Sequence, residues 1–156
     1  MKIDLHIHTK TSSDGNLPIE EVFQEAKKRN IDLISITDHD SVDCQKRAIA
    51  LAKKHGMSLI TGIELNVTFH YPEGNKDVSL DFLGYGYNSG NPELKSKLQL
   101  IQKHREIRAR QILQNLNVEF DKEGIERFTE EDLKKIQDSV DGAFGRPHIA
   151  NYLIRK

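Results

Sequence analysis

Residues 2–9 of the chain read KIDLHIHT. Apolar and polar side chains alternate along this segment, which is the periodicity of a β-strand. Because residues i and i+2 of a strand share a face, we expect His6 and His8 to lie side by side, with Asp4 on the same face. Two neighbouring imidazoles can hold one metal ion, although such a pair is also common as a purely structural feature. The segment therefore predicts a first strand whose polar face could carry a metal site.

Helices and strands alternate after this segment. Pro18 suits the first turn of a helix, and residues 31–37 are nearly continuous in apolar side chains, as in strands that are buried on both faces. A second helix, with Ser41 as its expected cap, ends at Gly56, and residues 57–63 are expected to form a third buried strand. This order predicts an α/β fold with a parallel sheet and right-handed crossovers.

The remainder of the chain departs from this alternation. Residues 66–88 contain two strand-like segments around a turn and are expected to form a hairpin. Pro92 opens a long helix that is expected to reach about Asn117 and that carries an excess of lysine and arginine. Further helices are expected from Thr129 and from residues 145–148.

Bulk composition is that of a globular protein, with 37% hydrophobic and 30% charged residues. The formal net charge of −1 gives no reason to expect binding to nucleic acid or to a membrane, and no apolar run is long enough to cross a bilayer. Cys44 is the only cysteine, so an intrachain disulfide is excluded and a reducing, cytoplasmic location is the default expectation. No linker divides the chain, so residues 1–156 are expected to form one domain.

Apart from His6 and His8, which lie within the first predicted strand, side chains that bind metals gather where the predicted strands end, which is the edge at which α/β proteins place their active sites. Imidazole and carboxylate ligands without a thiolate suit Mn²⁺, Zn²⁺ or Fe²⁺ better than Ca²⁺. A pair of such ions can clamp a phosphate and lower the pKa of a bound water. The candidate ligands are His6, His8, Asp14, His39 and Glu64.

Short motifs surround these residues in succession: His6-Ile7-His8-Thr9, Ser13-Asp14-Gly15, Thr37-Asp38-His39-Asp40 and Gly62-Ile63-Glu64. Together they resemble the motifs of the PHP (polymerase and histidinol phosphatase) family of metal-dependent phosphoesterases. The resemblance implies a distorted, seven-stranded TIM-like β/α barrel with two or three divalent ions, manganese first among them and zinc or iron as alternatives.

The same resemblance implies a division of the ligands. His6 and His8 would share one ion, and Asp14 and His39 would bind a second. Glu64 would bridge the two, and His39 and Glu64 would be the residues essential for catalysis.

The resemblance also implies a role for three more carboxylates. Asp4, Asp38 and Asp40 would stand behind the histidines and orient them; for Asp38 and Asp40 the alternative is capping of the next helix.

Many proteins of the branch described next carry a histidine ligand to a third ion at the position where this chain has Asp81. A carboxylate can also bind such an ion, and His70 is a weaker substitute.

Two later segments are similar to the branch that contains nucleoside 3',5'-bisphosphate phosphatases and 5'-to-3' exoribonucleases. They are Phe82-Leu83-Gly84-Tyr85 and Gly145-Arg146-Pro147-His148-Ile149-Ala150, with an arginine-rich helix between them. By that likeness, a helical insertion in the barrel brings substrate-binding side chains to the site, and the planar fork of arginine suits phosphate oxygens. For the helix arginines, Arg105 and Arg108, the alternative is a solvated basic face. The expected substrate-binding side chains are Arg105, Arg108, Arg146 and His148.

The later motifs of the family barrel do not follow His148, so a PHP domain without the C-terminal part of its barrel is expected. An open barrel exposes a strand edge and apolar surface, which favours self-association.

The expected activity is hydrolysis of a phosphate ester by a water molecule that the ions activate. The substrate would be a phosphomonoester of a nucleotide or a short RNA. A non-catalytic PHP module and a metal-dependent amidohydrolase stay open as alternatives. The intact metal motifs favour an enzyme, and the motif at residues 37–40 favours a phosphoesterase.

Overall fold

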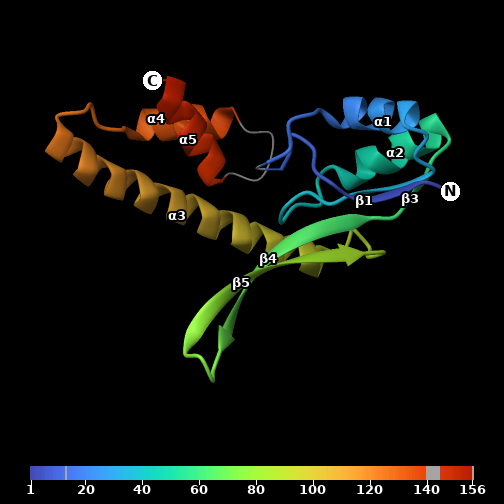
Figure 1. The fold of residues 1–156 in the computed structure, drawn as a ribbon, viewed down its shortest axis with the longest axis horizontal. Helices are drawn as coiled ribbons and strands as arrows, with labels where there is room; N and C mark the ends of the chain where they lie inside the picture. The colour runs from blue at the N-terminus through green and yellow to red at the C-terminus, as the bar shows by residue number, and fades with distance from the viewer. Residues whose placement is uncertain (13, 140–144, 156) are drawn as a thin grey trace.

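The computed structural model describes residues 1–12, 14–139 and 145–155. Its first half is a three-stranded parallel sheet with the order β1-β2-β3, formed by β1 (Ile3–Ile7), β2 (Leu33–Ile36) and β3 (Ser58–Leu59). The helices α1 (Ile19–Lys28) and α2 (Gln45–His55) lie together on one side of this sheet (Figure 1). The predicted α/β alternation and the parallel pairing are confirmed.

One apolar core joins the two helices to the sheet. Helix α1 has acidic residues in its first turn and basic residues in its last, as the helix dipole favours. Its buried Phe23 shares the core with Ile34 and Ile36 of β2 and with Ala48 of α2. Burial of a side chain of that size contributes about 1.5–3 kcal/mol. The core therefore fixes the strands so that their carboxyl ends open on the same side.

The start of α2 differs from expectation. Ser41 does not cap it: the Ser41 hydroxyl accepts the backbone N–H of Asp43 and donates to its carboxylate, and the helix begins only at Gln45. The buried amide of Gln45 donates to the carbonyls of Ile36 (2.9 Å) and Gly62 (2.8 Å). This side chain therefore ties the end of β2 to Gly62, where β4 (Gly62–Tyr71) begins.

The third predicted strand is also different, because it is divided in two. Residues 58–59 pair with β2, and the chain then leaves that sheet as β4 (Gly62–Tyr71), which pairs antiparallel with β5 (Lys76–Tyr85). A Cβ atom at Gly62 would stand 2.1 Å from the Ser35 hydroxyl oxygen and 2.9 Å from the Ile36 carbonyl oxygen. Only glycine lets β4 pass this close to β2.

The β4–β5 ribbon is the predicted hairpin, and it has two unlike faces. In Figure 1 it extends away from the parallel sheet on the side opposite α1 and α2. One face carries Glu64, Asn66 and Asp81. The other is apolar and exposed, with Val67 at 41% and Phe69 at 54%, which agrees with the expected exposure of apolar surface.

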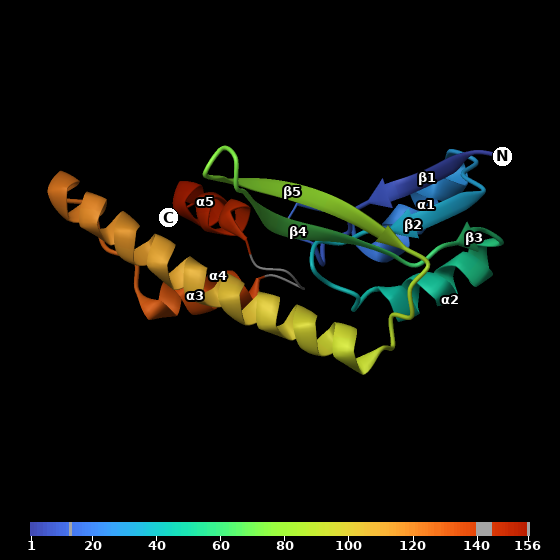
Figure 2. The same cartoon turned by 90° about the horizontal axis from the view of Figure 1, so that it is seen from below.

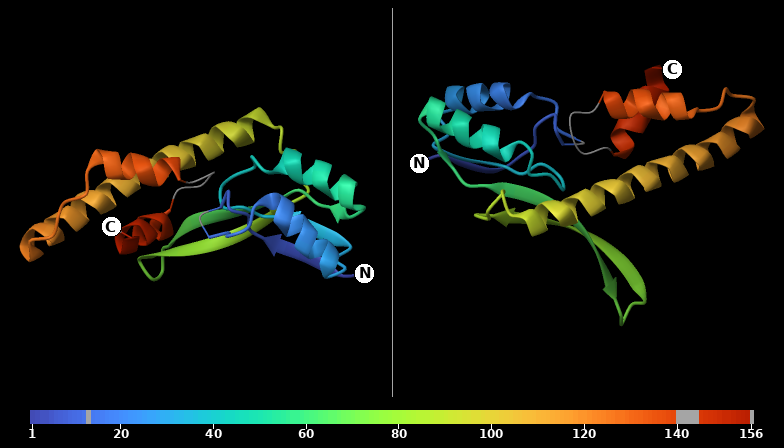
Figure 3. Two further views of the ribbon diagram at one scale, coloured as in Figure 1. Left: turned by 90° about the horizontal axis from the view of Figure 1, so that it is seen from above. Right: turned by 180° about the vertical axis from the view of Figure 1, so that it is seen from behind.

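The remaining helices extend from near α2 toward the opposite end of the molecule (Figures 2 and 3), and the first of them packs through Leu98 on Val42 and Ile63. They are α3 (Pro92–Glu123), α4 (Glu130–Asp138) and α5 (Arg146–Arg155). Helix α3 is longer than predicted and ends at Gly124, whose φ of 67° suits glycine. Leu113 of α3, Leu133 of α4 and Ile149 of α5 share one core. Within the described part of the chain, no helix is long and apolar enough to cross a membrane.

Candidate metal centre

Backbone pairing brings the loop after β2 against β4. His39 and Glu64 form a parallel β-bridge, in which the Asp40 N–H donates to the Glu64 carbonyl at 2.8 Å and the Glu64 N–H donates to the Asp38 carbonyl at 3.3 Å. The imidazole of His39 therefore lies beside the Glu64 carboxylate, with His39 Nε2 3.8 Å from Glu64 Oε2, even though His39 follows a strand of one sheet and Glu64 belongs to the other.

The first group of ligand atoms joins β1 to β4. His6 Nε2 lies 2.9 Å from Glu64 Oε2, His8 Nε2 lies 2.7 Å from the same oxygen, and the two Nε2 atoms are 3.2 Å apart. Ligands that each stand about 2.1 Å from one ion are about 3 Å from their neighbours. The spacing of these three atoms therefore fits a single ion.

A second group forms around the loop after β1. Asp14 Oδ1 lies 2.6 Å from His8 Nδ1, and Asp14 Oδ2 lies 3.3 Å from His39 Nε2. The Ser12 hydroxyl donates to Asp14 at 2.9 Å and accepts the His39 N–H at 3.2 Å. Burial pushes the pKa of Asp14 upward, but hydrogen bonds from His8 and Ser12 outweigh it and hold the pKa below its usual value.

His8 supplies the physical argument that this donor set fits cations. Its two ring nitrogens each lie within hydrogen-bond distance of a carboxylate, yet a neutral imidazole has only one N–H to donate. An ion held at His8 Nε2 would take the one lone pair of a neutral ring, while Nδ1–H donates to Asp14, and it would also relieve the close approach of His6 Nε2. Asp14 and His39 form a further possible group, so the arrangement is that of a ligand cluster for more than one ion.

Asp81 joins the cluster from β5. Ligand atoms of Asp81, His39 and Glu64 lie within 4.8 Å of one another. The alternative, His70, lies farther along the ribbon, exposed and 2.9 Å from Asp77. Within the described residues, His70 belongs to none of the possible ligand groups. The structure thus places Asp81, and not His70, where a third ion could bind.

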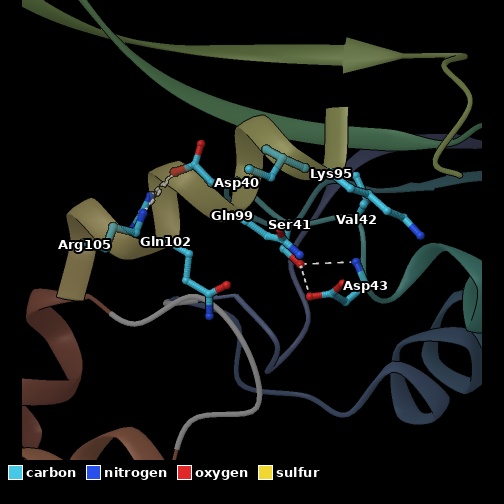
Figure 4. A pocket seen from close by; sticks show the side chains of 9 residues that line it. Asp40, Ser41, Val42, Asp43, Lys95, Gln99, Gln102 and Arg105 are labelled. Carbon is cyan, nitrogen blue, oxygen red and sulfur yellow. Dashed lines mark hydrogen bonds and ion pairs between the residues drawn. The ribbon is translucent and has the colours of Figure 1, made fainter. Parts of the chain in front are cut away.

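A cleft of about 630 Å³ opens from the cluster between the ribbon, α3 and α5. His39 and Asp81 lie at its wall on the metal side, and Arg105, Arg108 and Arg146 also line it. A smaller pocket of about 340 Å³ lies between residues 40–43 and α3. Arg105 and Asp40 line both spaces, and Figure 4 shows these two side chains joined to each other.

The PHP domain family matches residues 4–124. The chain belongs to the PHP family. A 5'-3' exoribonuclease of Haemophilus influenzae is 30% identical to it over 99% of this chain and 51% of its own length. A 3',5'-nucleoside bisphosphate phosphatase of Chromobacterium violaceum is 36% identical over 70% of this chain and 36% of its own length.

Solved structures agree on the PHP-like fold. An amidohydrolase from Chromobacterium violaceum, with bound sulfate and no metal, superposes with a TM-score of 0.76 at 27% identity over 99% of this chain and 50% of its own. A candidate metal-dependent phosphoesterase from Bifidobacterium adolescentis gives a TM-score of 0.77 at 25% identity over the same shares. The chain spans about half the length of these proteins, and its described strands form part of a PHP barrel without closing one.

Three carboxylates have other partners than the PHP motifs implied. Buried Asp38 accepts hydrogen bonds from the Thr9 N–H (2.7 Å), the Thr9 hydroxyl (2.8 Å) and the Thr11 hydroxyl (2.5 Å). It therefore holds the loop that leads to Asp14. Asp40 binds Arg105 and the N–H of another residue, Asn66.

Exposed Asp4 accepts the backbone N–H of His6, at 3.4 Å. Among the contacts of the described residues, none of these three carboxylates touches a histidine ring. Asp38 and Asp40 do not cap α2 either, because that helix begins at Gln45.

The structure differs from two expectations about substrate-binding residues. Arg105 faces the cleft but is bound to Asp40, so it is neither free for substrate nor part of a solvated face. His148 is not among the residues that line the cleft as described; its Nδ1 lies 3.2 Å from the Gly145 N–H, and burial lowers its pKa. Ser13, within one of the PHP motifs, lies outside the described residues.

Sequence reasoning also missed residues that hold the PHP site together. Ser12 and Asn66 each bind candidate ligands, and the Tyr85 hydroxyl donates to the Leu5 carbonyl of β1 at 2.8 Å. Asn66 had a usable signal, because it stands two residues after Glu64 and so shares its strand face. Ser12 and Tyr85 act across loops and sheets, where periodicity gives no signal.

Proposed function

We propose that this chain takes part in metal-dependent hydrolysis of phosphate esters. One observation carries the proposal: a single cleft contains candidate metal ligands, His39 and Asp81, together with the guanidinium groups of Arg108 and Arg146. A phosphate ester needs both, because its oxygens are anionic and its phosphorus must be activated toward water. The membership of the PHP family supports the same chemistry.

The roles of the side chains follow from their positions. His6, His8, Asp14, His39 and Glu64 would hold divalent ions, with manganese as the first candidate. Such ions, when bound, polarise phosphoryl oxygens and acidify water. His39 and Glu64, which pair through their backbones, are the residues on which catalysis would depend most; like His8, each contributes to two possible ligand groups. Arg108 and Arg146 would bind the phosphate, and Arg105 would hold the cleft wall in place through Asp40.

The proposed substrate is a nucleotide phosphomonoester or a short RNA. The names of the curated relatives, an exoribonuclease and a nucleoside bisphosphate phosphatase, support this class. We also propose that residues 1–156 act as one PHP domain, because α4 and α5 share a core with α3, which lies within the matched region.

An amidohydrolase is the second candidate, since one similar solved structure carries that name. The arginine-lined cleft favours an anionic substrate over a neutral amide. Release of inorganic phosphate from nucleotides, measured against release of amine from amide substrates, separates the two classes.

The test is metal content together with manganese-dependent phosphate release. Purified without a chelator, the protein should hold at least two ions per chain, and His39→Ala or Glu64→Ala should lower metal content and abolish turnover. His70→Ala is the matched control, because that exposed histidine lies outside the candidate ligand groups. Full turnover in both His39→Ala and Glu64→Ala would show that the proposed site is wrong.

A further inference from the structure

Asn66 stands beside Asp81 on the polar face of the ribbon. The two residues are directly opposite in the β4–β5 register. The Asn66 side-chain amide donates to Asp81 Oδ1 at 2.7 Å and to the Ser79 hydroxyl at 3.0 Å. The backbone N–H of Asn66 donates to Asp40 Oδ1 at 3.3 Å. One residue therefore touches both a candidate ligand and the partner of Arg105.

We propose that Asn66 is a positioning residue that makes Asp81 a metal ligand. An exposed aspartate turns freely about its side-chain bonds, and binding an ion would require that freedom to be lost. The amide of Asn66 holds one carboxylate oxygen of Asp81 and leaves the other available to an ion shared with His39 and Glu64. This inference rests on the proposed metal centre and adds to it the group that orients one of its ligands.

The chemistry of Asn66 suits that task. Its NH₂ group donates to the carboxylate without adding a charge that would repel a cation, as a lysine would. It shares a strand face with Glu64, two residues earlier, so the two ligands Glu64 and Asp81 and the orienting amide move as one rigid unit. The bond from its N–H to Asp40 ties this unit to the loop that carries His39.

The length of the ligand explains why an orienting partner is needed here. An aspartate carboxylate reaches less far from the backbone than an imidazole does. Asp81 therefore has less room to adapt to the ion than a histidine at the same position would have. A fixed rotamer compensates, and ligating carboxylates are generally held by hydrogen bonds of this kind.

The experiment is calorimetric titration of Mn²⁺ into metal-depleted full chain, for wild type, Asn66→Ala, Asp81→Ala and the double variant. Loss of a group that orients a ligand typically costs about 10–100-fold in metal affinity, and we expect Asn66→Ala to weaken the weakest class of site by that factor. In the double variant, the loss should equal that of Asp81→Ala alone, because Asn66 acts through Asp81.

Val67→Thr is the matched control. This neighbouring side chain points to the opposite, exposed face of the ribbon, so its replacement should leave all Mn²⁺ affinities unchanged. Circular dichroism checks that each variant folds. If Asn66→Ala does not, Asn66→Leu has nearly the same shape without the donor and gives the same test.

The outcomes separate this inference from the function on which it rests. If the wild type binds several ions and Asn66→Ala binds them with the same Mn²⁺ affinities, Asn66 does not position Asp81, and the proposed metal centre is unaffected. If the affinity losses of Asn66→Ala and Asp81→Ala add up in the double variant, the proposed role of Asn66 is also wrong, because the two residues then act independently. Wild type that binds no Mn²⁺ overturns both the metal centre and the role of Asn66.

Discussion

Arg105 of α3 and Asp40 of the loop after β2 form an ion pair, with Arg105 Nε 3.1 Å from Asp40 Oδ2. The Asp40 side chain is only 4% exposed and that of Arg105 is 23% exposed. The pair fastens the arginine-bearing helix to the loop that carries His39. The position of the cleft wall relative to the metal centre therefore depends on this ion pair, together with the apolar cluster in which Leu98 of α3 packs with Val42 and Ile63.

Removing Arg105 should destabilise the protein. Arg105→Ala leaves the buried Asp40 carboxylate with the Asn66 N–H as its only partner among the contacts described, and breaking a buried ion pair costs about 3 kcal/mol. Urea denaturation measures this loss. Arg108→Ala, on the same cleft wall, should stay within about 0.5 kcal/mol of wild type. Equal stability of the two variants would contradict the structural role of the ion pair.

Reversing the charge of Arg146 should weaken substrate binding more than metal binding. Arg146 lines the cleft and is exposed, and a hydrogen bond to a charged group contributes about 1.5–3 kcal/mol, or roughly tenfold or more in affinity. Arg146→Glu should therefore raise the KM for a phosphate ester by at least about tenfold. Metal content, measured by elemental analysis, should not change. An unaltered KM would return Arg146 to a structural role.

Gly62→Ala should disturb both stability and the metal centre. The new Cβ would overlap the Ser35 hydroxyl, and overpacking of this kind costs about 1–3 kcal/mol. Because β4 must shift to relieve the overlap, Glu64 should move and metal affinity should fall. Gly56→Ala is the control: its φ of 67° imposes local strain, but nothing lies within 4 Å, so metal binding should persist. Thermal unfolding and Mn²⁺ titration of both variants check the contrast.

Alkaline pH should reduce stability through Cys44. Burial raises the pKa of this thiol above its usual value, so the folded state resists its ionisation while the unfolded state permits it. The stabilisation is complete below the pKa of the unfolded thiol, near 8.5, and falls by up to about 1.4 kcal/mol per pH unit above it.

Denaturation at pH 8 and pH 10 measures the effect of Cys44, and Cys44→Ala should lose less stability over this interval. A residual loss is expected in the variant, because burial also raises the pKa of Tyr87. Identical losses in both proteins would show that Cys44 does not contribute.

Much of the site could be predicted because its pattern is local. The alternation in residues 2–9 places His6 and His8 on one face of β1, and the structure brings their Nε2 atoms within 3.2 Å. The apolar run before Thr37 predicts a buried strand, so that His39 comes at its end. The division of the third strand was missed, because residues 57–63 read as one strand and the pattern does not show that the pairing partner changes along it.

The sequence alone predicts which residues could bind metal ions and near which strands they stand, because periods of two and 3.6 residues act over a few positions. The pairing of individual oxygen and nitrogen atoms depends on the folded structure. Asp38 accepts hydrogen bonds from Thr9 and Thr11, and Asp40 pairs with Arg105, 65 positions away. Such partners depend on where whole helices and ribbons pack, and packing distributes its energy over many weak contacts that no short motif records.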